Sequence, residues 1–327
     1  MSDRNDERRK QNPEEAVAEV QRLYDSGVAF FTKERIREAY EGIRGIGMSE
    51  TEIQVREIDG KLDTFKMKNE DVFRDPEDDS KWLARPAIDF ISIQNQLDPD
   101  RARVKSPYSN IRPVYLLVPS NRLEAELQEE EVNASLDKAI ELWRRSRSWE
   151  QLRSGLARFK LGPITKIVAF GLGSMRAFSE ENAQTNRSTV QHALLLTLCD
   201  LLISSTAQGT EINCYAQDPA YTEHDTAVLQ SRGVTVVPDP EGFLEVDDQT
   251  AVISVSPNVP VRQVVSEIAQ PRLMIWDAIR GDGFGELPMT DPASPRLQRL
   301  IHDHYETVDY LHERDYFRDV GIYVRRT

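Results

Sequence analysis

The chain has 327 residues, of which 39% are hydrophobic and 29% charged, a composition that suits one large globular domain or two modest ones. Its 41 Lys and Arg residues are outnumbered by 55 Asp and Glu residues, and the net charge of -14 argues against nucleic-acid binding, which depends on attraction to phosphates. No apolar run approaches the ~18 residues of a membrane span, and the first residues contain no apolar leader, so we expect no membrane contact and a cytoplasmic or nuclear location.

Residues 13–147 predict an N-terminal α+β region, preceded by a polar tail at 1–12 that we expect to be disordered. Pro13 followed by two acidic residues is typical of a helix start, and a second helix is expected over 32–43. Alternating apolar residues on both sides of Asp59-Gly60 predict a β-hairpin. The remaining expectations here are an acidic exposed loop over 69–81, strands over 87–93 and 114–118, and helices over 124–145 and 149–159, the last capped at Ser148.

Residues 148–327 alternate between strand and helix patterns. Strands are expected over 164–170, 211–216, 234–237, 251–256, 273–276 and 320–324, and helices over 189–203, 223–231, 261–269 and 297–311. Such alternation predicts a parallel sheet built from right-handed crossovers. The fold class is therefore α/β, a Rossmann-like mostly parallel sheet with flanking helices, preceded by the N-terminal α+β extension.

The most informative segment is KIVAFGLGSM, residues 166–175, which predicts a buried strand running into a glycine turn. Ligands of open α/β sheets bind outside the carboxyl ends of the strands, where glycines let the backbone approach the ligand closely. The other strands end at Asp218-Pro219, Asp239, Ser256-Pro257-Asn258 and Asp277. The candidate ligand-binding residues are Gly171, Leu172, Gly173, Ser174, Asp218, Pro219, Pro257, Asn258 and Asp277.

Each of these features also has a purely structural interpretation. The glycines could serve a tight turn only, Asp218 before a proline is a good turn residue, and two prolines near Asn258 could simply end a strand. The dinucleotide fingerprint is incomplete, because Arg176 stands where the third glycine belongs and Asp218 follows the glycines by more than twice the usual ~20 residues. A glycine-rich segment at 280–285 could act as a lid or as a plain surface loop.

No catalytic or metal-binding residues stand out. Cys199 and Cys214 lie in apolar or strand-like contexts and are expected to be reduced core residues. His302 and His304 are two residues apart in a predicted helix and do not share a face, so no zinc-binding spacing is present. A G-x-S-x-G nucleophile motif is also absent from the sequence.

The order of these motifs resembles the SRR-like domain, named for plant "sensitivity to red light reduced" proteins. The resemblance covers residues 164–277, roughly a third of the chain. It rests on GLGS at 171–174, Gln191 with its Leu-rich helix, Tyr215 followed by Asp218-Pro219, the helix end at 229–233, and Pro257. Family members typically carry Pro-His-Cys where this chain has Pro257-Asn258-Val259, and this divergence, with the long N-terminal extension, is similar to the fungal branch.

The resemblance implies a regulatory protein, cytoplasmic or nuclear, since members are linked to light and circadian signalling, cytoskeletal stability and haem metabolism. We therefore expect a regulatory protein with a small-molecule or nucleoside pocket and unidentified protein partners. Two alternatives stay open. An S-adenosylmethionine-dependent methyltransferase has a similar order of sites, and an interaction module could retain a vestigial pocket.

Overall fold

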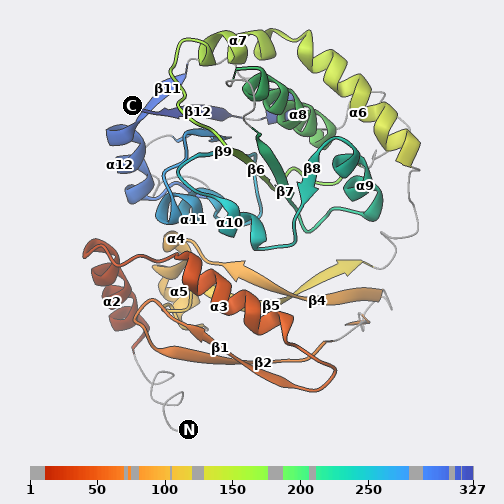
Figure 1. Cartoon of the computed structure of the whole chain (residues 1–327). Helices are drawn as coiled ribbons and strands as arrows, with labels where there is room; N and C mark the ends of the chain where they lie inside the picture. Colours follow the sequence, from red (N-terminus) through yellow and green to blue (C-terminus); the bar gives the residue numbers. More distant parts are fainter. Residues whose placement is uncertain are drawn as a thin grey trace.

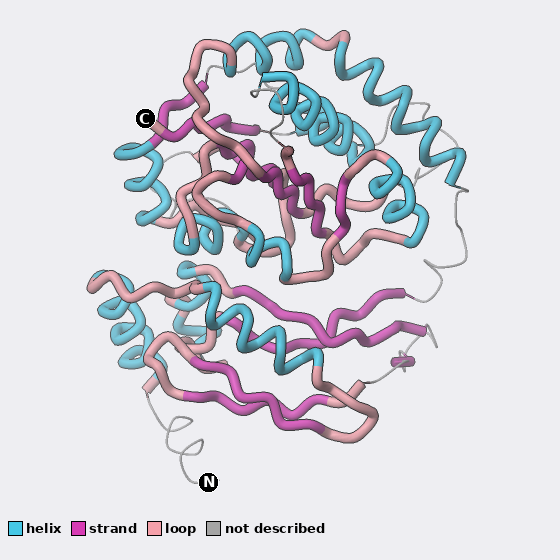
Figure 2. The backbone as a smooth tube through the Cα atoms, viewed as in Figure 1, coloured by secondary structure: helices cyan, strands magenta, loops and turns pink. Residues whose placement is uncertain are grey.

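The computed structural model describes residues 12–69, 73–74, 81–103, 105–119, 129–175, 187–205, 211–279, 290–308, 314–317 and 319–326. Figure 1 shows an N-terminal layer of short sheets and helices lying against a larger half that contains a seven-stranded sheet. The helices of the larger half lie on both sides of this sheet, as the backbone tube in Figure 2 also shows. Residues 1–11 of the polar tail expected over 1–12, most of the loop expected over 69–81 and the glycine-rich segment at 280–285 lie outside the described residues.

The seven strands of the large sheet follow the order β11-β12-β10-β9-β6-β7-β8. Strands β8, β7, β6, β9 and β10 are mutually parallel, whereas β12 is antiparallel to both β10 and β11. The bounds are β6 Lys166–Phe170, β7 Asn213–Gln217, β8 Val234–Val236, β9 Thr250–Ser254, β10 Leu273–Asp277, β11 Tyr305–Val308 and β12 Val320–Arg325. The predicted α/β class with a mostly parallel sheet and flanking helices is confirmed.

The strand sequences explain why both faces of the sheet are covered. In β6, Ile167 and Ala169 belong to one apolar cluster, while Val168 and Phe170 belong to another, because successive side chains point to opposite faces. The helices whose residues join the first cluster are α6 Glu129–Arg144, α7 Arg147–Leu156, α8 Arg187–Ser205, α9 Glu223–Ser231 and α13 Arg314–Phe317. Those joining the second are α10 Glu241–Glu245, α11 Val261–Ile268 and α12 Pro295–His304.

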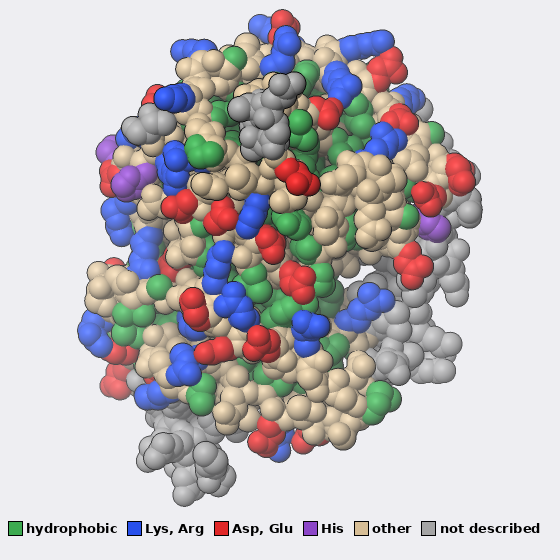
Figure 3. Space-filling model, viewed as in Figure 1, with side chains coloured by type: hydrophobic (Ala, Val, Ile, Leu, Met, Phe, Trp, Pro, Cys, Tyr) green, Lys and Arg blue, Asp and Glu red, His purple; other side chains and the backbone are tan. Residues whose placement is uncertain are grey.

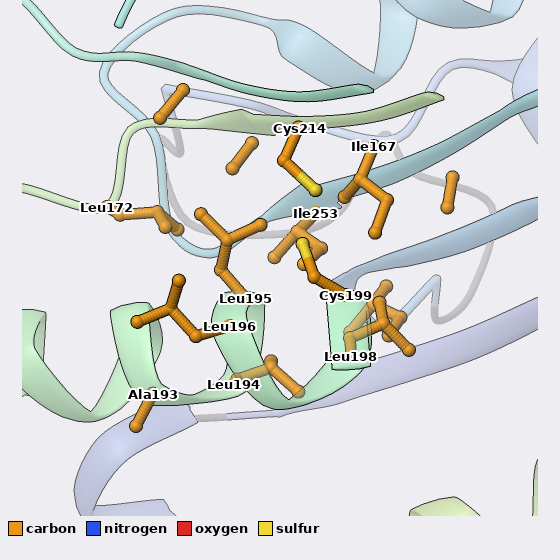
Figure 4. Close-up of a cluster of buried hydrophobic side chains, with 14 of the residues drawn as sticks. Ile167, Leu172, Ala193, Leu194, Leu195, Leu196, Leu198, Cys199, Cys214 and Ile253 are labelled. Atoms are coloured by element: carbon orange, nitrogen blue, oxygen red, sulfur yellow. The ribbon is translucent and has the colours of Figure 1, made fainter. Parts of the chain in front are cut away.

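Helix α8 fills the centre of the first cluster. Figure 4 shows its leucines packed below the sheet, with the thiol of Cys199 directed toward that of Cys214 on β7. Both cysteines are free and buried, as expected for core residues. Among the described residues α8 alone is long and apolar enough to cross a membrane, but 67% of its most apolar window is buried in the fold, as in an ordinary core helix.

The N-terminal layer packs on the second face of the sheet through a shared apolar core. Its elements are α2 Pro13–Asp25, α3 Lys33–Arg44, β1 Thr51–Arg56, β2 Leu62–Met67, β3 Phe73–Arg74, β4 Lys81–Phe90, α4 Ile93–Gln96, α5 Pro99–Ala102 and β5 Ile111–Pro119. Polar contacts fix the packing. The Glu267 carboxylate of α11 accepts the Phe31 N–H at 3.1 Å and pairs with Arg296 at 3.0 Å, and Arg296 also donates to the Val28 carbonyl at 2.9 Å.

Three local expectations differ from the structure. The helix expected over 297–311 ends at His304, and Tyr305–Val308 instead forms β11, paired with the distant strand β12. The cap of α7 is Ser146, which accepts the Trp149 N–H at 3.0 Å, so Ser148 lies inside the helix. Ser188, expected from the sequence as the cap of the helix over 189–203, likewise lies within α8, which begins at Arg187.

The predicted division at 147/148 stays a prediction. In the structure α6 precedes that point yet packs against α8 and α9 of the larger half.

Candidate functional site

The candidate site lies where the order of the parallel strands changes direction. Strands β7 and β8 lie on one side of β6, and β9 and β10 lie on the other, so the connections leave β6 and β9 in opposite directions. Phe170 at the end of β6 is level with Gln217 of β7 and Ser254 of β9, so three carboxyl ends meet at one edge. In open α/β sheets this switch point is where ligands bind.

The two segments at the switch point are in close contact. Gly171 has φ +67, and a Cβ on it would lie only 3.1 Å from the Pro257 Cβ. Only glycine therefore fits both the left-handed backbone and the space beside Pro257. The turn after β6 and the turn after β9 thus pack against each other at the edge of the sheet.

The glycine turn is held by the carboxylate of Asp218. The backbone N–H of Gly173 donates to Asp218 Oδ2 at 2.6 Å, and the N–H of Ala220 donates to Oδ1 at 2.8 Å. Burial raises the pKa of Asp218, whereas these two bonds lower it. Asp218 therefore joins the end of β7 to the turn.

A second carboxylate, that of Asp225, holds the rest of the turn. Asp225 lies fully buried in the first turn of α9 and closes a capping box with Thr222. Its Oδ2 accepts the Ser174 hydroxyl at 2.7 Å, and its Oδ1 accepts the Met175 N–H at 2.9 Å. The N–H groups of Gly173 and Met175, which a phosphate would need, are thus bonded to carboxylates of the protein itself.

The far side of the turn contacts α8. The Ser188 hydroxyl donates to the Leu172 carbonyl at 2.5 Å, and the Leu172 side chain is buried in the core. Behind Ser188, the fully buried His192 contacts the Ser188 carbonyl through Nδ1 at 2.8 Å and the Tyr221 hydroxyl through Nε2 at 2.9 Å. Burial lowers the pKa of His192 to about 4, so this imidazole is neutral at physiological pH.

Asp239 adds a third carboxylate to this edge. It follows β8, and its Oδ1 accepts the Gln217 amide at 2.7 Å. Burial, followed by the charges of Asp218 and Asp89, raises the pKa of Asp239 to about 7. Asp218 and Asp239, the acidic residues at the ends of β7 and β8, therefore both have raised pKa values.

On the other side of the switch point, Asp277 connects β10 to the turn after β9. Its Oδ1 accepts the Ser256 N–H at 3.2 Å, and Ser256 has a positive φ of 51. Beneath it, the guanidinium of Arg262 donates to the Asp277 carbonyl at 2.8 Å and forms a buried ion pair with Asp291 at 3.2 Å. Asn258 is exposed at the surface of this turn.

The structure brings most of the predicted residues together. The turn at 171–174 contacts Asp218 directly and Pro257 by packing, while Pro219 and Asn258 are exposed beside them and Asp277 supports the β9 turn. A role for them in ligand binding stays a prediction. Sequence reasoning missed Asp225, which it placed only within the helix expected over 223–231, and did not include Asp239 among the candidates.

No group of three His, Cys, Asp or Glu side chains in the described part of the chain could hold a metal ion.

On the face in Figure 3, acidic and basic side chains are interspersed over both halves of the molecule.

Among the solved structures that match the chain, two are similar to it at low scores. The crystal structure of a putative O-methyltransferase from Klebsiella pneumoniae matches with a TM-score of 0.33 and 11% identity, covering 63% of this chain and 94% of that chain. Cofactor-bound Rv0187 from MTB matches with a TM-score of 0.32 and 15% identity, covering 63% and 93%. Scores this low carry no functional implication.

No curated protein matches the chain. The family model of the SRR1 domain matches residues 135–323, which are 189 of the 327 residues. The match begins within α6 and extends into β12, so it spans the seven-stranded sheet and the turns at its carboxyl edge. The chain belongs to the SRR1 domain family.

Proposed function

We propose that this SRR1-domain protein is regulatory and binds a small nucleoside, uncharged or cationic, at the carboxyl edge of its sheet. The observation that carries the proposal is the bonding of the glycine turn. Asp218 and Asp225 already accept its donors, so the turn offers no free N–H pair to a phosphate at Gly173 and Met175. Carboxylates instead suit ribose hydroxyls and amines, which donate hydrogen bonds.

The finer parts of the proposal follow from the family. A regulatory role in the cytoplasm or nucleus, with protein partners, agrees with the functions linked to SRR-like proteins. Pro257-Asn258-Val259 in place of the usual Pro-His-Cys supports a fungal-type member, and a chemistry dependent on that His and Cys would be absent here.

A second candidate is an S-adenosylmethionine-dependent methyltransferase. Its support is the placement of an acid after β7, the second strand in the chain order of this sheet, and of Ser256-Pro257-Asn258 after β9, on either side of the glycine turn. S-adenosylmethionine is a nucleoside with a cationic sulfonium group, so it matches an acidic edge better than a nucleotide does. The two candidates therefore share a ligand class and differ in whether a methyl group is transferred.

Calorimetric titration of the full chain tests the ligand class. We expect adenosine, S-adenosylmethionine or S-adenosylhomocysteine to bind at least about tenfold more tightly than AMP or NAD, a difference of about 1.4 kcal/mol. Tighter binding of S-adenosylmethionine and S-adenosylhomocysteine than of adenosine would favour the methyltransferase.

Two variants test whether the nucleoside binds at the sheet edge. Asp239→Asn should weaken nucleoside binding, whereas Asp200→Asn, an exposed carboxylate of α8, should leave it unchanged. If none of these compounds binds at millimolar concentration, the nucleoside site is refuted and an interaction module with a vestigial pocket is the better account.

A further inference from the structure

A cavity of 410 Å³ lies in the N-terminal layer, and none of the candidate residues at the sheet edge lines it. All of its lining residues come from 89–112, the end of β4, helices α4 and α5 and the start of β5. Its size is within the range of about 300–1,000 Å³ that is typical of small-molecule sites. The polar and charged residues that matter below are Asp89, Gln96, Asp100, Arg101, Lys105 and Arg112.

The cavity is cationic although the whole chain is acidic. Arg112 is half-buried, and its guanidinium is fixed by donating through Nε to the Ser109 carbonyl at 2.7 Å and through Nη2 to the Ser106 carbonyl at 2.9 Å. Nη1 takes no part in these two bonds. Burial lowers the pKa of Arg112, while the charge of Asp89, its cross-strand neighbour, raises it.

The other charges around the cavity leave a positive balance. Lys105 is exposed, and no described carboxylate lies within 4 Å of its ammonium group or of the Arg112 guanidinium. Asp100 pairs with Arg103 at 3.1 Å, and Arg101 lies 3.8 Å from Asp98. Asp89 therefore remains as the one lining acid without an ion pair among the described residues, opposed by Lys105 and Arg112.

Gln96 supplies a second, independent indication of a ligand. It lines the cavity, it is only 2% exposed, and neither its Nε2 nor its Oε1 has a hydrogen-bond partner among the described residues. A buried amide with both polar atoms unpaired is unfavourable, and folded proteins rarely contain one without a function or a bound molecule. A rotation of the side chain toward the cavity would let a ligand with a donor and an acceptor pair with both atoms.

We propose that this cavity binds a small organic anion, its charged group held by Arg112 and Lys105 and its polar body by the Gln96 amide. A phosphate monoester and a carboxylate share this chemistry, because both accept charge-assisted hydrogen bonds from guanidinium and ammonium groups. The cavity therefore prefers anions, whereas the acidic sheet edge is proposed to prefer uncharged or cationic ligands. The two sites can therefore be tested separately in the same protein.

The experiment is calorimetric titration of the full chain with glycerol 3-phosphate, with malate and with glycerol. We expect one of the two anions to bind and glycerol not to bind, and the anion that binds distinguishes phosphate from carboxylate recognition. Lys105→Met should weaken binding about tenfold, whereas Lys160→Met, which removes an exposed lysine outside the cavity, should leave it unchanged. Asp200→Asn, which changes the exposed carboxylate of α8, should also leave it unchanged.

Gln96→Met separates ligand recognition from a structural role. It should weaken anion binding and leave the urea midpoint of the free protein equal or higher, because two unpaired polar atoms leave the interior. A lower midpoint with unchanged binding would show that Gln96 is structural and would overturn its assigned contact. The site itself is overturned if neither anion binds at a ligand concentration on the order of 10 mM. It is also overturned if Lys105→Met and Lys160→Met have the same effect on anion binding.

Discussion

Replacing Gly173 by alanine measures how far the turn is fixed before any ligand binds. Gly173 has φ +75, and a Cβ there would lie 3.1 Å from the Ser188 hydroxyl oxygen. A left-handed backbone costs a residue with a Cβ about 1–2 kcal/mol. In addition, Ser188 would have to shift although its hydroxyl is bonded to the Leu172 carbonyl at 2.5 Å. We expect Gly173→Ala to lower the free energy of unfolding by about 2 kcal/mol.

Two other glycines provide matched controls. Gly233 has a similar φ of +77, but a Cβ at this position would have nothing within 4 Å, so Gly233→Ala isolates the backbone strain at about 1 kcal/mol. Gly47 has neither a positive φ nor a neighbour within 4 Å, and Gly47→Ala should be neutral or stabilise by about 0.4–1 kcal/mol through the unfolded chain.

Equilibrium urea unfolding of the three variants gives the comparison. A double mutant then isolates the contact, since Gly173→Ala in a Ser188→Ala background should cost no more than Gly233→Ala. If Gly173→Ala instead costs as little as Gly47→Ala, the turn is not fixed in the conformation described, and the reasoning from the left-handed backbone is refuted. In that case close approach of a ligand would be the better reason for the glycine.

Two further predictions concern the carboxylates around the turn. Asp225→Asn should lower the free energy of unfolding by about 1.5–3 kcal/mol, because a charged acceptor of several buried donors is lost. The exposed Asp200→Asn should cost less than about 1 kcal/mol in the same urea assay, and equal losses would contradict the assignment. Asp239 has a pKa of about 7 in the folded protein, above its ordinary value of 3.8. Between these two values the folded protein holds a proton on Asp239 that the unfolded chain has released. The stability that this proton contributes is lost as the pH rises from about 4 to about 7. Asp239→Asn should therefore gain stability relative to the wild type as the pH rises from about 4 to about 7, and a difference that does not change with pH would exclude the raised pKa.

The sheet was predictable because its signals are local. The strands KIVAF and TAVIS are apolar on both faces, and each helix that follows has its own apolar residues. Strand β11 was not predictable in this way. Tyr305 and Val308 are three residues apart, a spacing typical of a helix, and their conformation is decided instead by pairing with β12, beginning with Tyr305 opposite Arg325.

The candidate site was predictable in position and only partly in composition. The rule for open sheets indicated the carboxyl edge, and the structure places Gly173 and Asp218 in direct contact there. The bonds from Ser174 and Met175 to Asp225 join residues about fifty positions apart in the chain, so no local pattern reports them. The same is true of the cavity in the N-terminal layer, since Gln96 and Arg112 lie between the strands expected over 87–93 and 114–118, where no element was predicted.

The bonding of the glycine turn changes what such a turn implies about ligands. In a dinucleotide fold the free N–H groups and the helix that follows attract a pyrophosphate. Here the carboxylates of Asp218 and Asp225 already accept the N–H groups of Gly173 and Met175. A phosphate would have to displace one of these carboxylates and would then lie close to the negative charge of the other. A ligand that donates hydrogen bonds or carries a positive charge meets neither obstacle. Under the proposed function, the same edge selects nucleosides over nucleotides whether the protein acts as a regulator or transfers a methyl group, and the identity of the preferred nucleoside distinguishes the two.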